Sequence, residues 1–109
     1  EISSAFDTSH AEIIEKSQYD AFYRTSLQKR LDELQITTPV VTGVMTNLCC
    51  ETTARSAFVR GYRVIMPVDG TATVNSELHR SSTVNLAHGF TEPVSVTALL
   101  ESIRKNCDY

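Results

Sequence analysis

A short apolar segment, a turn and a helix that carries a cysteine constrain the fold of this chain more than any other feature. The residues 39–44 are mostly β-branched and almost without polar side chains. Such a segment is typical of a strand that is buried on both faces of a parallel sheet. After it the apolar positions follow helical spacing up to a stop at Gly61, and they are Cys50, Ala54, Ala57 and Phe58.

Cys49 lies at or next to the start of this predicted helix, at the carboxyl end of the predicted strand. Unpaired N–H groups and the helix dipole favour a thiolate there. Open α/β sheets usually keep their chemistry at the carboxyl ends of the strands. The alternative is a structural role, because cysteine is among the most frequently buried residue types.

The rest of the chain predicts alternating helices and strands. A helix runs from Leu27 to about Gln35, with a candidate capping box at Thr25–Gln28. The further predicted elements are a strand at Arg63–Val68, a helix capped by Asn75 or Ser76 that runs to about Ala87 before a stop at Gly89, a strand near Phe90–Val94 and a helix with the apolar stripe Val96, Leu99, Leu100 and Ile103. This alternation predicts an α/β fold with a mainly parallel, Rossmann-like sheet that is covered on both faces.

Charge and composition exclude several classes of protein. The net charge is −3, and basic residues are mixed with acidic ones, which argues against a nucleic-acid surface. No apolar run approaches the ~20 residues that cross a bilayer. Three cysteines form no disulfide framework, so we expect a cytoplasmic protein. No metal-ligand spacing joins His10, His79 and His88, and we expect each to be a surface or cap residue without a metal.

The run from Gly43 to Tyr62 resembles the signature of the isochorismatase-like cysteine hydrolases, which include nicotinamidases and ureidoacrylate amidohydrolases. The pattern Gly-x-x-Thr-x-x-Cys-x-x-x-Thr-Ala is matched at Gly43, Thr46, Cys49, Thr53 and Ala54. Further matches are Lys16–Phe22, in which Asp20 replaces a frequent serine, and the segments Asp69–Thr73 and Glu77–His79. We expect Asp69 to fix a turn, since Asp-Gly is a common turn pair.

The resemblance implies roles for individual residues. Cys49 is the nucleophile, and Cys50 is its buried neighbour. Lys16, delivered by a short strand at Glu12–Lys16, supports the thiolate as a buried ammonium, although an isolated lysine is in most cases a solvated surface charge. The N–H groups of Met45 and Cys49 form the oxyanion hole, with a cis Val44–Met45 peptide. Tyr19, Phe22 and Thr46 are the expected substrate-binding residues, and the aromatic pair is equally compatible with a core role.

The resemblance also implies a three-layer α/β/α domain whose N-terminal strands are missing from this chain. Members of the family begin with a strand that ends in an aspartate, the general base, and nothing in residues 1–109 corresponds to it. We therefore expect residues 1–109 to be the C-terminal portion of a single hydrolase domain. The missing segment and a second copy of the chain are the expected partners, and that segment is where a divalent metal could bind.

The expected function is hydrolysis of a carboxamide or ureido C–N bond of a small molecule through a thioester, as in nicotinamidases. One alternative is isochorismatase-type chemistry, but enzymes of that reaction lack the nucleophilic cysteine. The other is a catalytically silent member that acts in interaction or in redox sensing through Cys49 and Cys50.

Overall fold

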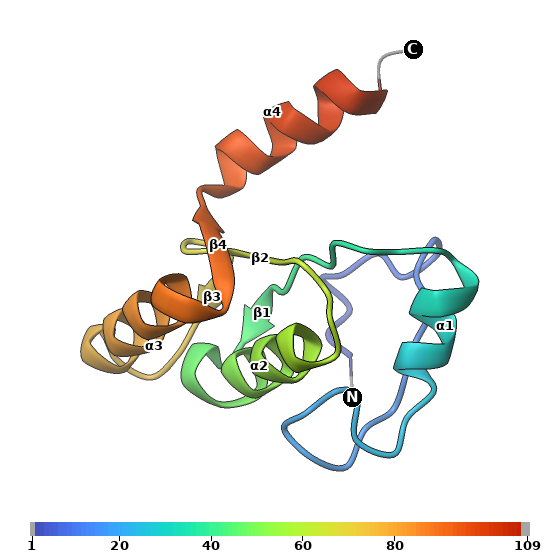
Figure 1. Ribbon diagram of the computed structural model, residues 1–109, viewed down its shortest axis with the longest axis horizontal. Helices are drawn as coiled ribbons and strands as arrows, with labels where there is room; N and C mark the ends of the chain where they lie inside the picture. The colour runs from blue at the N-terminus through green and yellow to red at the C-terminus, as the bar shows by residue number, and fades with distance from the viewer. Residues whose placement is uncertain (1, 108–109) are drawn as a thin grey trace.

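The computed structural model describes residues 2–107, in which helices and strands alternate along the chain (Figure 1). The elements are α1 (Leu27–Glu33), β1 (Gly43–Val44), η1 (Thr46–Cys50), α2 (Glu51–Val59), β2 (Val64–Pro67), β3 (Thr71–Ala72), α3 (Ser76–Gly89), β4 (Thr91–Val94) and α4 (Val96–Cys107). Within these residues, no helix is long and apolar enough to cross a membrane.

All the strand pairs among the described residues are parallel. β2 pairs with β4, with Val64 opposite Thr91, and β1 pairs with β3. A single bridge between Val40 and Ile65 brings the segment before β1 alongside β2. The predicted mixed α/β fold with parallel strands is therefore confirmed.

The strand predicted at residues 39–44 is shorter and more open than expected. Only Gly43 and Val44 form ladder pairs, and 67% of the Val44 surface is exposed. The prediction of burial on both faces is wrong for this structure. In residues 2–107 the segment pairs along one edge only, with the β2–β3 segment, so its other edge has no partner.

The strand predicted at Glu12–Lys16 is absent, because no described segment pairs with its backbone and residues 11–16 have no regular structure. A strand needs the ladder of a neighbour to exist. The segment is instead attached through a side chain, since Glu12 forms a salt bridge with Arg30 of α1.

Helix ends follow the sequence closely at most positions. The Asn75 side chain accepts a hydrogen bond from the Leu78 N–H at the start of α3, and Gly61 follows α2 with a φ of 94°. The capping box before α1 is half formed: Thr25 Oγ1 accepts from the Leu27 N–H at 3.3 Å, while among the described residues the Gln28 side chain makes no return bond to the Thr25 N–H.

The core lies where α2 and α3 pack against each other and against β2 and β4. The predicted stripe of α2 is buried at Cys50, Ala54 and Ala57, while Phe58 is exposed and packs edge-on against Phe90. The buried hydrophobic residues are Phe22, Cys50, Ala54, Ala57, Tyr62, Val64, Met66 and Leu86. α4 projects away from this body (Figure 1). Its first N–H, from Val96, donates to Asp69 Oδ1, so Asp69 connects the turn after β2 to the start of α4.

Candidate active site

Cys49 lies in the wide helical turn that joins β1 to α2. This turn, η1, is π-helical, and the Met45 carbonyl accepts from both the Leu48 and the Cys50 N–H groups at 3.1 Å. The helical segment thus begins at Thr46, and Cys49 lies a turn inside it rather than at its first residue. π-helical turns are rare in proteins, and those that occur are often found at functional sites.

Lys16 reaches Cys49 from a distant part of the sequence. Its Nζ lies 3.7 Å from Cys49 Sγ and donates a hydrogen bond of 2.8 Å to the Gln18 carbonyl. The lysine is exposed rather than buried as expected, because residues 11–16 lie outside the sheet. Within residues 2–107 no carboxylate forms a salt bridge with Lys16, so its positive charge is available to a thiolate.

Cys50 has the surroundings of a core residue. Only 3% of its surface is exposed, and its Sγ contacts the Thr42 carbonyl at 3.8 Å. Burial, with a smaller effect of the neighbouring Cys49, raises the pKa of the Cys50 thiol to about 11. The two adjacent thiols therefore differ in environment, and Cys50 is the buried neighbour that the sequence predicts.

The Val44–Met45 peptide is cis, as the resemblance implies. The oxyanion role of the Met45 and Cys49 N–H groups stays a prediction.

The three expected substrate-binding residues have very different surroundings. Thr46 is fully buried, and its hydroxyl bonds to Thr71 Oγ1 at 3.0 Å and to His79 Nδ1 at 2.9 Å. Its side chain is enclosed in this structure because the helical turn begins at Thr46 and directs the hydroxyl toward β3 and α3. Substrate contact by Thr46 stays a prediction.

The aromatic pair divides between core and surface. Phe22 is 6% exposed and stacks on Tyr62 with ring centroids 6.0 Å apart, which is a core environment. Its substrate contact stays a prediction. Tyr19 is 52% exposed and, with Gln18, Tyr23 and Thr52 among the other residues, lines an open pocket of about 370 Å³. Its substrate contact stays a prediction.

His79 has a role that the sequence did not indicate. It was expected to be a surface or cap residue, yet its Nε2 lies 2.8 Å from the Val68 carbonyl and its Nδ1 binds Thr46. His79 and Ser82 are three positions apart on α3, hence on one face of that helix, and both contact η1 residues. The spacing was visible in the sequence, but the facing turn was not.

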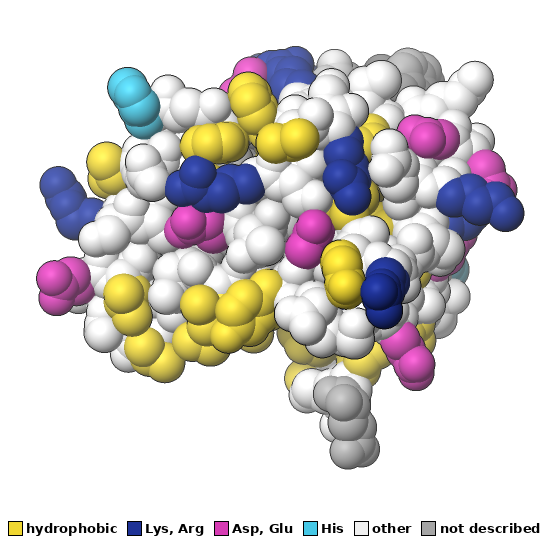
Figure 2. Space-filling model, turned by 60° about the horizontal axis from the view of Figure 1, so that its bottom comes forward, with side chains coloured by type: hydrophobic (Ala, Val, Ile, Leu, Met, Phe, Trp, Pro, Cys, Tyr) yellow, Lys and Arg dark blue, Asp and Glu magenta, His cyan; other side chains and the backbone are white. Residues whose placement is uncertain are grey.

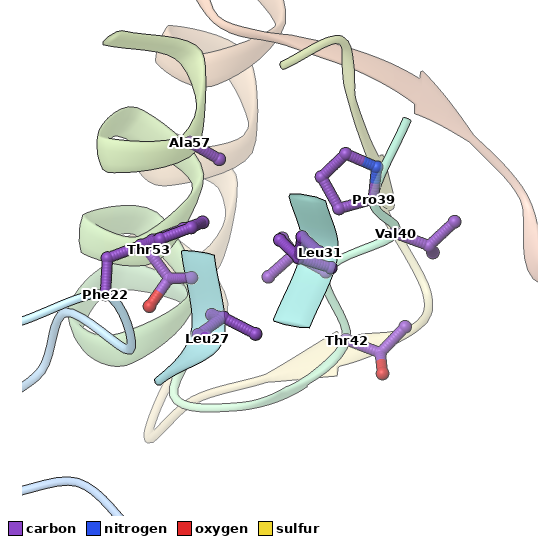
Figure 3. A pocket seen from close by; sticks show the side chains of 9 residues that line it. Phe22, Leu27, Leu31, Pro39, Val40, Thr42, Thr53 and Ala57 are labelled. Atoms are coloured by element: carbon purple, nitrogen blue, oxygen red, sulfur yellow. The ribbon is translucent and has the colours of Figure 1, made fainter. Parts of the chain in front are cut away.

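An apolar cavity lies apart from Cys49. It measures about 320 Å³ and lies between α1, α2 and the 39–42 segment (Figure 3). Its lining residues are Phe22, Leu27, Leu31, Pro39, Val40, Val41, Thr42, Thr53 and Ala57. Neither Cys49 nor Lys16 lines it. The face in Figure 2 shows basic and acidic side chains interspersed among hydrophobic ones, without the basic cluster that binds nucleic acid.

Parallel strands with a cysteine just beyond the end of one of them form the kind of α/β unit that binds ligands at the carboxyl ends of its strands. Residues 3–98 match the isochorismatase domain family, and the chain belongs to that family of hydrolases. It is 48% identical over 95 residues to nicotinamidase 3 of Arabidopsis thaliana, covering 87% of this chain and 48% of that protein. It is 39% identical to a ureidoacrylate amidohydrolase of Methylobacterium radiotolerans, covering 68% of this chain and 29% of that protein.

Solved structures agree with this assignment. An isochorismatase-like hydrolase from Alkaliphilus metalliredigens superimposes with a TM-score of 0.85 at 33% identity, covering 89% of this chain and 54% of that one. A cysteine hydrolase from Pseudomonas syringae pv. phaseolicola gives 0.92 at 28% identity, covering 96% and 55%. The chain thus spans about half the length of the relatives named here, apart from the ureidoacrylate amidohydrolase, of which it spans less.

Proposed function

We propose that the protein carrying this chain hydrolyses a carboxamide or ureido C–N bond of a small molecule, with Cys49 as the nucleophile. The observation that supports this most is the 3.7 Å separation of Lys16 Nζ and Cys49 Sγ. An ammonium at that distance favours the thiolate, which is the reactive form of cysteine. The similarity to a nicotinamidase and to a ureidoacrylate amidohydrolase supports amides of this kind as substrates.

The reaction would proceed in two steps. The Cys49 sulfur attacks the carbonyl carbon and forms a C–S bond, the C–N bond breaks, and ammonia or an amine leaves with the proton from the thiol. Water then adds to the thioester, which releases the acid and restores the thiol. The Met45 and Cys49 N–H groups are the proposed donors to the oxyanion of each tetrahedral intermediate.

The proton of the thiol needs an acceptor. The resemblance implies an aspartate outside this sequence, on a strand that would complete a three-layer α/β/α domain. The unpaired edge of the 39–44 segment and the absence of a carboxylate partner for Lys16 in the described part of the chain are compatible with such a segment. In that arrangement Lys16 lies between thiolate and carboxylate and favours both anions.

The test measures ammonia release by the intact protein from nicotinamide and from ureidoacrylate. We expect turnover of at least one compound, and a loss of about 10³-fold or more in the Cys49→Ala variant. Cys50→Ala is the matched control, because it removes the adjacent thiol, and it should retain activity in its folded fraction. Turnover that survives in Cys49→Ala would refute the assignment of Cys49 as the nucleophile. Absence of turnover with both compounds would favour the catalytically silent alternative.

A further inference from the structure

His79 makes two hydrogen bonds whose directions can be worked out. The Val68 carbonyl, 2.8 Å from Nε2, can only accept, so Nε2 carries the proton. In the neutral imidazole Nδ1 is then an acceptor, and the Thr46 hydroxyl, at 2.9 Å, donates to it. The Thr46 hydroxyl also shares a hydrogen bond of 3.0 Å with Thr71 Oγ1. His79 therefore links the end of β2 to the first residue of η1 through a directed chain.

Other polar contacts fix the same turn at neighbouring points. Ser82 Oγ lies 2.7 Å from Glu51 Oε1 and 3.3 Å from the Thr46 carbonyl. The Ser82 hydroxyl donates its proton to the closer group, the Glu51 carboxylate. Thr73 Oγ1 donates to Asn47 Oδ1 at 2.6 Å. The turn that carries Cys49 is thus held mainly by hydrogen bonds from β3 and α3.

The hydrogen bonds to Thr46 connect the position of the Cys49 sulfur to β3 and α3. Cys49 is only half-buried, and Lys16 comes from a segment without regular structure. Thr46, by contrast, is fully buried three residues before Cys49 and is the first residue of the turn. A shift of Thr46 therefore moves the sulfur relative to both Lys16 and the N–H of Met45.

We infer that His79 is a positioning residue for the Cys49 nucleophile and that it acts through the Thr46 hydroxyl. The inference rests on the proposed function, because only that function makes Cys49 a nucleophile. The hydrogen bond between His79 and Thr46 does not depend on it. His79 contacts no reacting atom. Its effect should therefore appear in the reactivity of Cys49 and in kcat, and much less in KM.

Two substitutions separate the two bonds of His79. In His79→Asn, the amide oxygen can take the place of Nδ1 and accept from Thr46, while the bond to Val68 is lost. In His79→Gln, the terminal amide nitrogen can take the place of Nε2 and donate to Val68, while the bond to Thr46 is lost. Each variant removes one hydrogen bond, so a merely structural role predicts similar effects of both. His88→Gln, on an exposed position of the same helix, is the matched control.

The experiment measures kcat, KM and the rate of Cys49 alkylation by iodoacetamide in the intact protein, corrected for the folded fraction. We expect His79→Gln to lower kcat and the alkylation rate by about tenfold or more, since a small misplacement of a reacting group is costly. His79→Asn should stay within about threefold of wild type, and His88→Gln should match it. Equal effects of the two His79 variants, or none, would overturn the inference.

A second pair of variants keeps the test decisive where a His79 variant does not fold. Thr46→Ser retains the hydroxyl and should stay near wild type, whereas Thr46→Val keeps the shape and should reproduce the loss expected for His79→Gln. Similar alkylation rates in Thr46→Val and Thr46→Ser would also overturn the inference. A wild-type Cys49 that reacts no faster than Cys50 would instead count against the proposed function, so the two failures are distinct.

Discussion

The ammonium of Lys16 lies 3.7 Å from the sulfur of Cys49, although the two residues are 33 positions apart in the sequence. The cysteine comes from the turn after β1, and the lysine comes from an irregular segment near the start of the chain. A second bond, from Nζ to the Gln18 carbonyl, holds the lysine in this orientation. This pair is the basis of the predictions about reactivity below.

Replacement of Lys16 by methionine should impair catalysis while leaving the fold in place. Methionine keeps the apolar stem and removes the charge that favours the thiolate. We expect kcat/KM for amide hydrolysis to fall by about a hundredfold or more, with slower alkylation of Cys49. Lys29→Met, on the exposed surface of α1, is the control. Unchanged turnover and unchanged alkylation in Lys16→Met would remove Lys16 from the site.

Cys49 should react with iodoacetamide at neutral pH much faster than Cys50. Cys50 is buried and its pKa is raised to about 11, so at pH 7 it is almost entirely the unreactive thiol. Brief labelling of the native protein followed by peptide mass spectrometry gives the two rates. Equal labelling of both cysteines in the folded protein would argue against the assignment of Cys49. Cys107 was also expected to react slowly, but its side chain lies outside the described residues.

The same thiol makes stability depend on pH in the alkaline range. The unfolded chain releases the Cys50 proton near 9, and the folded protein retains it up to a pKa of about 11. The contribution of the Cys50 thiol to the free energy of unfolding is therefore fully present below pH 9, and it is lost as the pH rises toward 11. The loss should amount to about 2–3 kcal/mol. Urea unfolding at a series of pH values should show a shallower loss in Cys50→Ala, and parallel curves would contradict the assignment.

Much of the framework was predictable because its signals are local. The Asn75 cap, the Gly61 stop and the apolar stripe of α2 depend on neighbouring positions in the sequence, and the structure has all three. The strand at Glu12–Lys16 failed because a strand requires a partner that local sequence does not reveal. The burial of Thr46 and the bridge made by His79 were missed for a similar reason, since they depend on contacts between β2, η1 and α3. Lys16 was found only through the family resemblance.

Loss of the Asn75 cap should destabilise the protein by about 1 kcal/mol. The Asn75 side chain accepts from the Leu78 N–H at 2.8 Å, a group that has no partner within the helix. Asn75→Ala removes this acceptor, and Asn75→Ser retains one. Chemical unfolding should therefore place the serine variant within a few tenths of a kcal/mol of wild type. Equal stability of the alanine variant would show that the cap contributes nothing.

The 109-residue chain on its own should associate through the open edge at residues 39–44. Val44 is 67% exposed beside unpaired backbone groups, and such edges recruit other strands. Light scattering should show oligomers or aggregates, and Val44→Lys should reduce them. Val59→Lys is the matched control, because Val59 is 77% exposed but lies at the end of α2. A monomeric wild-type chain that unfolds cooperatively would contradict this prediction.

The most direct test of the central claim is to trap the covalent intermediate on Cys49. The intact protein is mixed with a hydrolysable amide, quenched in acid within the first turnover, digested and examined by mass spectrometry. The account predicts that the peptide containing Cys49 and Cys50 gains the mass of the acyl group, that fragmentation assigns it to Cys49, and that hydroxylamine removes it. Turnover at full rate without an acyl adduct on Cys49, or with the adduct on Cys50, would contradict it.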